Sequence, residues 1–492
     1  MRHPRNEGGS VVVWTMIIVA ILSLLGAEVL HVVSAKYQNA LQTASWQEAL
    51  LGAESGIDLA IVELRKSLYP SPNNSWDTTT GWTNASTNGV VTHSKNTATA
   101  AVPMTITVNV DAPATLIDPK NGWQYYRIRT AGSMPVNGPP RAGDNKQDTR
   151  LRKLNLLVDR FANGAALSAP KATRRAEAIV RPVSAFDQAI MSVGTLNLTD
   201  NNIIIDSYDS RDIAKSTPSA NGPDGIAGTA DDGTGPGLYD VAKRQQNGDI
   251  ATDGQILNAG NAFVYGDVST NSGTATGVNN VTGQQRTDFY QDPIPIAAPS
   301  WPSVNPTPMI VSGNATLTAS AVPDSPASRY VLSSVTLAGN QVLTLSGNPN
   351  GTPTYVNIYV TGAVQATGNA QIVLGPGVKA KMYFGGNVSI AGNGVVNTNN
   401  QPGDLLLYGI DPPSGTSRSF QLGGNSLLSA AVYAPGYDVQ INNGGTRGSV
   451  FGSFVGKTVT MNGVTDLHYD EALGSGGIIN NYKIVSWFED TR

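Results

Sequence analysis

The densest cluster of reactive side chains near the C-terminus is the run His468, Tyr469, Asp470 and Glu471. A histidine beside carboxylates has the composition of an acid–base or metal site. Successive residues of a strand point to opposite faces, so consecutive side chains do not converge on one ligand. We therefore expect this run to serve the fold rather than chemistry.

A second candidate site is the glycine-rich segment 221–237, NGPDGIAGTADDGTGPG, which carries Asp224, Asp231 and Asp232. Carboxylates on such a loop can surround Ca²⁺ with oxygen ligands, although their spacing does not match an EF-hand. Two interpretations stay open. The three aspartates form a Ca²⁺ site, or they tip a surface loop that holds no cofactor.

Enzymatic action on a polysaccharide would need paired carboxylates, or a Ca²⁺ cluster with a basic residue, on one face of the fold. The acidic residues between 356 and 466 are Asp404, Asp411, Asp438 and Asp466. No two of them occupy matching positions of the repeat described below. We expect no enzyme, and a membrane-anchored carbohydrate-active protein remains the alternative.

The composition narrows the classes of partner and the sources of stability. The 492 residues contain no cysteine, which excludes disulfides and thiolate chemistry. Only 14% of the residues are charged and the formal net charge is -4, so nucleic acid is not an expected partner. Short clusters of Val, Ile and Leu among Asn, Thr, Ser and Gly predict a mainly β protein after residue 70.

The N-terminus has the pattern of a membrane segment. Residues 1–9 form a basic leader, and Val11 to Ala27 reads VVVWTMIIVAILSLLGA without a charge. The 18 residues from Ser10 to Ala27 would rise about 27 Å as a helix, close to the hydrocarbon thickness of a membrane. The basic flank stays cytoplasmic, which places the rest of the chain outside the inner membrane.

The same helix is expected to continue beyond the membrane, over residues 10–68, because no proline occurs between Pro4 and Pro70. An apolar seam at helical spacing marks its outer half and must be buried against another element. The seam consists of Leu50, Ala53, Ile57, Ala60 and Leu64.

The first seventy residues resemble those of PilX-type pilus assembly proteins, through the leader, the Gly-Ser junction, the stretch ending LLGA and the continuation QEALLGAESGIDLAIVELRKS. The resemblance implies that a prepilin peptidase cuts after Gly9, or alternatively after Gly8, leaving Ser10 first. It also implies other pilin-like subunits as partners. Major pilins carry a glutamate at the fifth mature position, whereas this chain has Trp14, which favours a minor or tip subunit.

Residues 69–184 are expected to form a linker and a small antiparallel sheet that serves as a head for the helix. Period-two alternation marks strands at 104–112, 124–132, 150–161 and 174–183, whereas 71–101 reads as a loop. Arginines gather on these strands, and we interpret them as a solvated face or as a patch for an acidic partner or surface glycan. They are Arg127, Arg129, Arg150, Arg152, Arg174, Arg175 and Arg181.

Residues 185–492 are predicted to form a parallel β-helix, or solenoid, interrupted at 292–309 by a proline-rich segment that serves as a strap over its surface or as a connector. Between 356 and 466 a motif recurs about every 20 to 25 residues, which suits one rung of such a fold. Residues 478–492 are expected to form a strand or a cap that closes its last rung. The stretches AVYAPG, GSFVGKTVTMNG and LHYDEAL resemble a β-helical surface domain that follows pilin-like N-termini.

Together these observations predict a structural minor pilin-like subunit of a type IV pilus or related filament, anchored in the inner membrane and displayed on the cell surface if assembled. A pseudopilin of a type II secretion system has the same N-terminus and stays a second alternative.

Overall fold

The structure is a computed structural model of the 492-residue chain. It describes residues 8–69, 75–87, 90–98, 104–118, 122–136, 171–198, 203–220, 222, 233, 236–301, 308–347, 352–391, 393–423, 428–442, 448–463 and 465–490.

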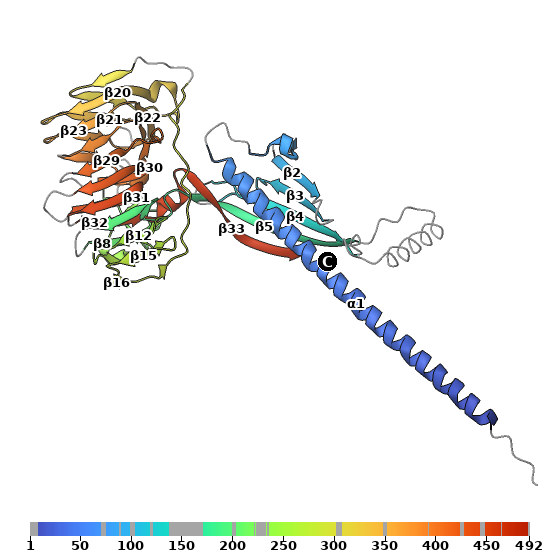
Figure 1. The fold of residues 1–492 in the computed structure, drawn as a ribbon. Helices are drawn as coiled ribbons and strands as arrows, with labels where there is room; N and C mark the ends of the chain where they lie inside the picture. Colours follow the sequence, from blue (N-terminus) through green and yellow to red (C-terminus); the bar gives the residue numbers. More distant parts are fainter. Residues whose placement is uncertain are drawn as a thin grey trace, which may run out of the picture.

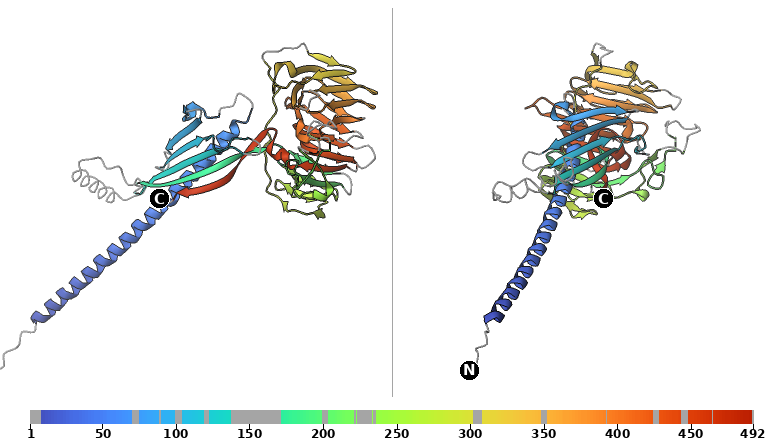
Figure 2. Two further views of the ribbon diagram at one scale, coloured as in Figure 1. Left: turned by 180° about the vertical axis from the view of Figure 1, so that it is seen from behind. Right: turned by 90° about the vertical axis from the view of Figure 1, so that its right-hand side faces the viewer.

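A single long helix, α1 (Gly8–Lys66), runs through the N-terminal region (Figure 1). The turn after Lys66 ends it two residues before the predicted Leu68, and Arg65 and Lys66 lie in its last turn, where positive charge stabilises the helix dipole. Figure 2 shows a sheet lying across the outer half of α1, while the inner half stands free. The predicted helix is therefore confirmed.

That sheet is antiparallel, in the order β1-β2-β3-β4-β5-β33, and it forms the head. Its strands are β1 (Trp82–Thr87), β2 (Val90–Ala98), β3 (Thr105–Asp111), β4 (Tyr126–Pro135), β5 (Lys171–Ser184) and β33 (Ile479–Asp490). Strands β3, β4 and β5 confirm three of the four predicted ones. The fourth, at 150–161, lies outside the described residues.

The apolar seam of α1 packs on this sheet as predicted, with one shift of position. Ala53, Ile57, Ala60 and Leu64 are buried, but Ala49 takes the buried position expected for Leu50, which is half-buried. Their partners are apolar residues on the inner face of the sheet. They are Val108, Val110, Ile128, Ala176, Ala178, Val180 and Tyr482.

One prediction about the head is wrong, and another holds in part. The segment expected as a loop contains the hairpin β1–β2, whose polar threonines and serines alternate on a sheet edge that faces water. The end of the chain was expected to be a strand or a cap of the solenoid. It forms strand β33, which pairs antiparallel with β5 in the head and does not cap the body. Period-two alternation predicts a strand and does not identify its partner.

The remaining strands form the body. They are β6 (Ile190–Ser192), β7 (Thr195–Leu198), β8 (Ile204–Tyr208), β9 (Thr217–Pro218), β10 (Gly237–Leu238), β11 (Ile250–Thr252), β12 (Ile256–Asn258), β13 (Phe263–Val264), β14 (Val268–Thr270), β15 (Thr274–Thr276), β16 (Asn280–Val281), β17 (Gln285–Arg286), β18 (Met309–Val311), β19 (Ala315–Thr318), β20 (Arg329–Leu337), β21 (Val342–Ser346), β22 (Thr354–Val360), β23 (Val364–Ala366), β24 (Gln371–Leu374), β25 (Val378–Phe384), β26 (Val388–Ile390), β27 (Gly394–Asn397), β28 (Leu405–Gly409), β29 (Arg418–Gly423), β30 (Leu428–Asn442), β31 (Gly448–Asn462) and β32 (Thr465–Asp470). Short 3₁₀ turns are η1 (Thr78–Thr80), η2 (Val241–Lys243), η3 (Pro326–Ser328), η4 (Pro402–Asp404) and η5 (Glu471–Ser475).

Apart from the short antiparallel pair β9–β10, the strands of the body pair in parallel, in a 21-stranded and a 4-stranded sheet that wrap around one core. Each turn of chain supplies one strand to each wall, as β22, β23 and β24 do, and pairs with the next turn, β25, β26 and β27. Side chains that point inward at matching positions stack into ladders. One ladder runs through Val364, Val388, Phe420, Val439, Val459 and Leu196, all of them buried.

The order of the turns differs from the predicted solenoid. The first turn along the chain, β6–β8, lies between the second turn, β11–β13, and the last turn, β31–β32. The last turn of the chain therefore pairs directly with the first. The proline-rich segment carries the chain from β17, at one end of the stack, to β18 at the other. A periodic sequence predicts the turns but not which turns become neighbours, because all of them present similar apolar ladders.

Candidate assembly stem and polar clusters

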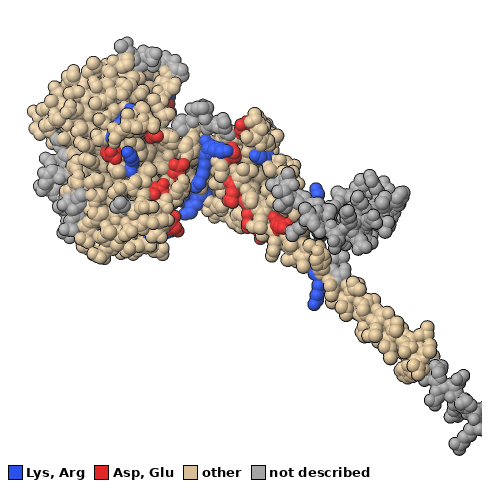
Figure 3. All heavy atoms as spheres, viewed as in Figure 1, with Lys and Arg blue, Asp and Glu red and all other residues tan. Residues whose placement is uncertain are grey.

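The inner half of α1 exposes an apolar surface. Every large apolar side chain from Val11 to Val33 is exposed, and Figure 3 shows most of this surface without charge. By length and composition, α1 is the one helix among the described residues that can cross a membrane. Gly9 and Ser10, the predicted processing residues, lie in its first turn, and Trp14 is exposed. We call residues 11–33 the stem.

The outer half of α1 approaches the sheet unusually closely, because small residues line both sides. A Cβ atom added to Gly132 in β4 would lie 1.9 Å from the carbonyl oxygen of Ala49 and 2.9 Å from the amide nitrogen of Ala53. Only glycine allows the helix backbone to reach the strand at this point. The stem is therefore fixed to the head by backbone packing as well as by the apolar seam.

His468 does lie in a polar cluster, but its partners come from distant segments. Its Nδ1 lies 2.6 Å from Oδ1 of Asp206, which sits opposite it in the paired strands β8 and β32. Tyr239 donates a hydrogen bond of 2.7 Å to Oδ2 of the same carboxylate, and its ring stacks on His468 at 3.7 Å. Asp206 is fully buried and His468 is 5% exposed.

These contacts join the first turn of the body, which carries Asp206, to the last turn, which carries His468. They also hold Tyr239, which belongs to the segment between β8 and β11 that we call the insertion. Each carboxylate oxygen of Asp206 has a partner, since Oδ1 lies against His468 and Oδ2 accepts from Tyr239. The cluster therefore holds parts of the fold together and leaves neither oxygen open to a substrate. Sequence reasoning missed Asp206 and Tyr239. A signal was available, because Asp206 ends the apolar run Ile203–Ile205, where an unpaired charge would be costly.

The neighbouring residues of the run face elsewhere, as the alternation predicts. Tyr469 is buried and donates to the carbonyl oxygen of Phe186 at 2.7 Å. Oδ1 of Asp470 accepts the backbone N–H groups of Ser210 and Ala472, each at 3.0 Å. Among the described residues no group of three or more acidic or histidine side chains could hold a metal ion.

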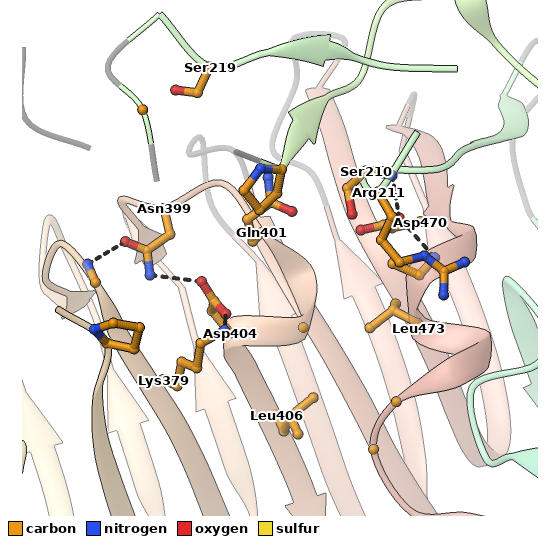
Figure 4. A pocket seen from close by; sticks show the side chains of 18 residues that line it. Ser210, Arg211, Ser219, Lys379, Asn399, Gln401, Asp404, Leu406, Asp470 and Leu473 are labelled. Carbon is orange, nitrogen blue, oxygen red and sulfur yellow. Dashed lines mark hydrogen bonds and ion pairs between the residues drawn. The ribbon is translucent and has the colours of Figure 1, made fainter. Parts of the chain in front are cut away.

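Asp470 also lines a pocket of about 540 Å³ between the insertion and the wall of the body (Figure 4). Across the pocket, Lys379 forms an ion pair of 2.6 Å with Asp404, and Asn399 donates to the other oxygen of that carboxylate at 3.0 Å. The two cationic side chains that line the pocket are both in ion pairs, Lys379 with Asp404 and Arg211 with Asp209.

The stability of the body is expected to depend on pH through Asp470. Burial raises the pKa of this carboxyl to about 6, from 3.8. Because the folded pKa is the higher one, Asp470 contributes full stability below about pH 4 and loses it as pH rises through 6. The shift of the pKa from 3.8 to about 6 corresponds to a loss of about 3 kcal/mol in the free energy of unfolding between these pH values. Urea unfolding of the wild type and of Asp470→Asn at pH 4 and pH 7 measures this loss.

The Asp470→Asn variant keeps an oxygen for the two N–H groups but cannot ionise. The difference in unfolding free energy between the two proteins should change by up to about 3 kcal/mol between these pH values, in favour of the variant at pH 7. Parallel pH profiles would contradict this prediction.

The other predicted sites have different outcomes. Asp224, Asp231 and Asp232 lie outside the described residues, so the Ca²⁺ site stays a prediction, which a calcium titration monitored by thermal unfolding would test.

The predicted basic patch is largely neutralised by ion pairs. Arg127 and Arg129 both contact Asp111, at 2.6 and 3.2 Å. Arg174 pairs with Glu489, and Arg175 lies 4.0 Å from Asp490. Arg150 and Arg152 lie outside the described residues. The ion pairs favour the interpretation as a solvated strand face.

These features define a mainly β protein whose N-terminal helix is long and apolar enough to cross a membrane and docks its outer half on an antiparallel head. Residues 330–475 match a family model described as a domain of unknown function, DUF7305, which covers turns of the body from β20 to η5. No curated protein matches the chain.

Among solved structures, the chain is similar to the competence-associated pilin ComZ from Thermus thermophilus, with 12% identity over 90% of this chain and 97% of that one. The TM-score is 0.20, which means that the two chains do not superpose as one fold.

Proposed function

We propose that this protein is a pilin-like structural subunit of a type IV pilus or related surface filament, held in the inner membrane by α1 before assembly. The observation that carries the proposal is the division of α1 into two halves. The stem exposes apolar side chains along its whole length, and the outer half is fixed to a sheet by backbone contact at Gly132. A helix of this kind can leave the membrane with its head and pack among other helices.

A minor or tip position is the finer part of the proposal. With Ser10 as first residue, Trp14 takes the place of the glutamate that major pilins carry at the fifth position. The body also adds a bulky unit to the head, between β5 and β33. Repetition of such a unit at every position of a fibre would need much lateral space, which favours few copies.

The proposal includes no catalytic activity. His468 and Asp206 join the last turn of the body to the first, and the cations of the pocket, Lys379 and Arg211, are held in ion pairs. Other pilin-like subunits and a prepilin peptidase are the proposed partners. A surface glycan is a further proposed partner, which the outer surface of the body would bind. A secretion pseudopilin would use the same stem, and neighbouring genes would distinguish the two.

Processing of the N-terminus tests the proposal. We expect that co-expression with a prepilin peptidase shortens the chain so that N-terminal sequencing starts at Ser10. Gly9→Val should block cleavage, because a bulky residue replaces the one before the cut, whereas Gly8→Val should not. An intact Met1 in the presence of an active peptidase that cuts a known prepilin would contradict the proposal.

A further inference from the structure

Large exposed apolar side chains concentrate in two places among the described residues. The first is the stem. The second is β33, where Ile484, Val485, Trp487 and Phe488 are between 39 and 58% exposed. Elsewhere on the head and body such residues are scattered singly or as the pair Met309 and Ile310. Ile484 and Trp487 lie on one face of the sheet, and Phe488, which pairs with Glu177, lies on the other. We call Ile484 and Trp487 the patch, because neighbouring exposed apolar side chains mark interaction surfaces.

The position of β33 in the sheet explains its exposure. A helix is about 10 Å wide and strands lie about 4.8 Å apart, so one helix covers about three strands. Here α1 packs mainly on β3, β4 and β5, and β33 extends the sheet past its flank. Ile484 and Trp487 pair with Val180 and Ala178, whose side chains face α1. Both therefore lie on the helix-covered face of the sheet, beside α1 and not beneath it.

We propose that the apolar stem of a second copy of this chain packs against β33, beside α1. A second helix there would continue the helix layer that α1 already forms on this face. The carboxylates at the end of the patch do not oppose an apolar helix, because Glu489 pairs with Arg174 and Asp490 lies near Arg175. The inference rests on the proposed function, since the stem needs apolar cover only outside the membrane.

The contact requires two copies that are staggered along the helix axis. The patch is level with Gly56, because Thr130 lies against Gly56 and pairs with Ala176, which pairs with Glu489. At 1.5 Å per residue, Val33 of the second copy must move about 35 Å to reach that level. Copies side by side in one membrane cannot make this contact, whereas copies offset along a fibre can.

The absence of cysteine makes disulfide cross-linking a clean test. One full-length chain carries Trp487→Cys and a second, distinguishable by mass, carries Val33→Cys at the end of the stem nearest the head, where the side chain is 58% exposed. The two are mixed in detergent, the detergent is removed, and the mixture is oxidised. We expect a mixed disulfide dimer at least fivefold above the control pair, in which Val322→Cys on the body, at 63% exposure, replaces the β33 position.

A second measurement separates this inference from the proposed function. Sedimentation of the unsubstituted chain after detergent removal reports whether copies assemble at all, whatever surface their stems contact. If the chain assembles while the Trp487→Cys pair stays at the level of the control, the inference is wrong and the proposed assembly stands. If the chain stays monomeric, both fail. Ile484→Cys, on the same face of the sheet as Trp487, serves as a second variant, and circular dichroism confirms that each protein is folded.

A membrane surface is the other candidate occupant of the patch. A fluorophore on the Trp487→Cys chain, reconstituted in vesicles with brominated lipids, distinguishes it. Strong quenching of this fluorophore, compared with one at Val322→Cys, would assign the patch to the membrane and overturn the inference. Equal fluorescence at both sites is the expected result.

Discussion

A chain that ends at Ile478 is expected to lose its folded head, although it lacks only the last 14 residues. Strand β33 pairs with β5 over most of its length, and Tyr482 is buried in the core of the head. Removal of a buried aromatic side chain costs about 3 kcal/mol or more, and each hydrogen bond lost costs about 1 kcal/mol. The sum approaches the total stability of a domain, about 5 to 15 kcal/mol. Limited proteolysis and the urea unfolding midpoint of the full chain in detergent would measure the loss.

The matched control removes the body and keeps β33. The amide nitrogen of Ala185 donates to the carbonyl oxygen of Ile478 at 2.8 Å, so the body enters and leaves the head at adjacent points. A short glycine-containing turn can replace residues 186–477, because hairpins close in two to five residues. This chain should keep a protease-resistant head. The prediction is wrong if the truncated chain resists protease as well as the full chain does.

The second large effect is expected from Gly132→Ala, a change of one methyl group. The new Cβ would lie 1.9 Å from the carbonyl oxygen of Ala49, and backbone of a helix cannot move aside as a side chain can. Overpacking usually costs 1 to 3 kcal/mol, and we expect at least about 3 kcal/mol here because α1 must lift from the sheet. Urea unfolding followed by tryptophan fluorescence measures the change, since the buried Trp82 belongs to this core.

Gly26→Ala provides the control for this substitution. Gly26 lies in the stem with no atom within 4 Å of the added Cβ, so alanine should stabilise the helix slightly, by up to about 1 kcal/mol. Equal unfolding midpoints for the two variants would show that the close contact at Gly132 is unimportant.

Local pattern predicted the elements of this fold well. The apolar run and the proline-free stretch predicted α1, and alternation predicted strands β3, β4 and β5 with their inward side chains. The buried position of Ala49 in place of Leu50 has a steric reason, since Gly132 requires a small residue opposite it. Seams defined by hydrophobicity alone overlook such positions, where small size matters more than apolar area.

Long-range pairing was the part that sequence alone could not supply. Strand β33 pairs with β5 across about 300 residues, and the partner of His468 is Asp206, 262 residues away. Each strand has unpaired N–H and C=O groups that suit many partners, so topology and packing decide the choice. The same reason explains why the first turn of the body joins the last one.

The body is inserted between β5 and β33, and this connection determines which strands would bear a force that pulls on the body. A load on the body reaches the head through both strands at once, at ends that lie next to each other. Since both strands run along the direction of pull, β5 would have to slide against β4, which breaks many backbone hydrogen bonds together instead of one after another. From the sheet the load passes into α1. A load on the body would therefore be resisted by the whole set of hydrogen bonds between β4 and β5 at once.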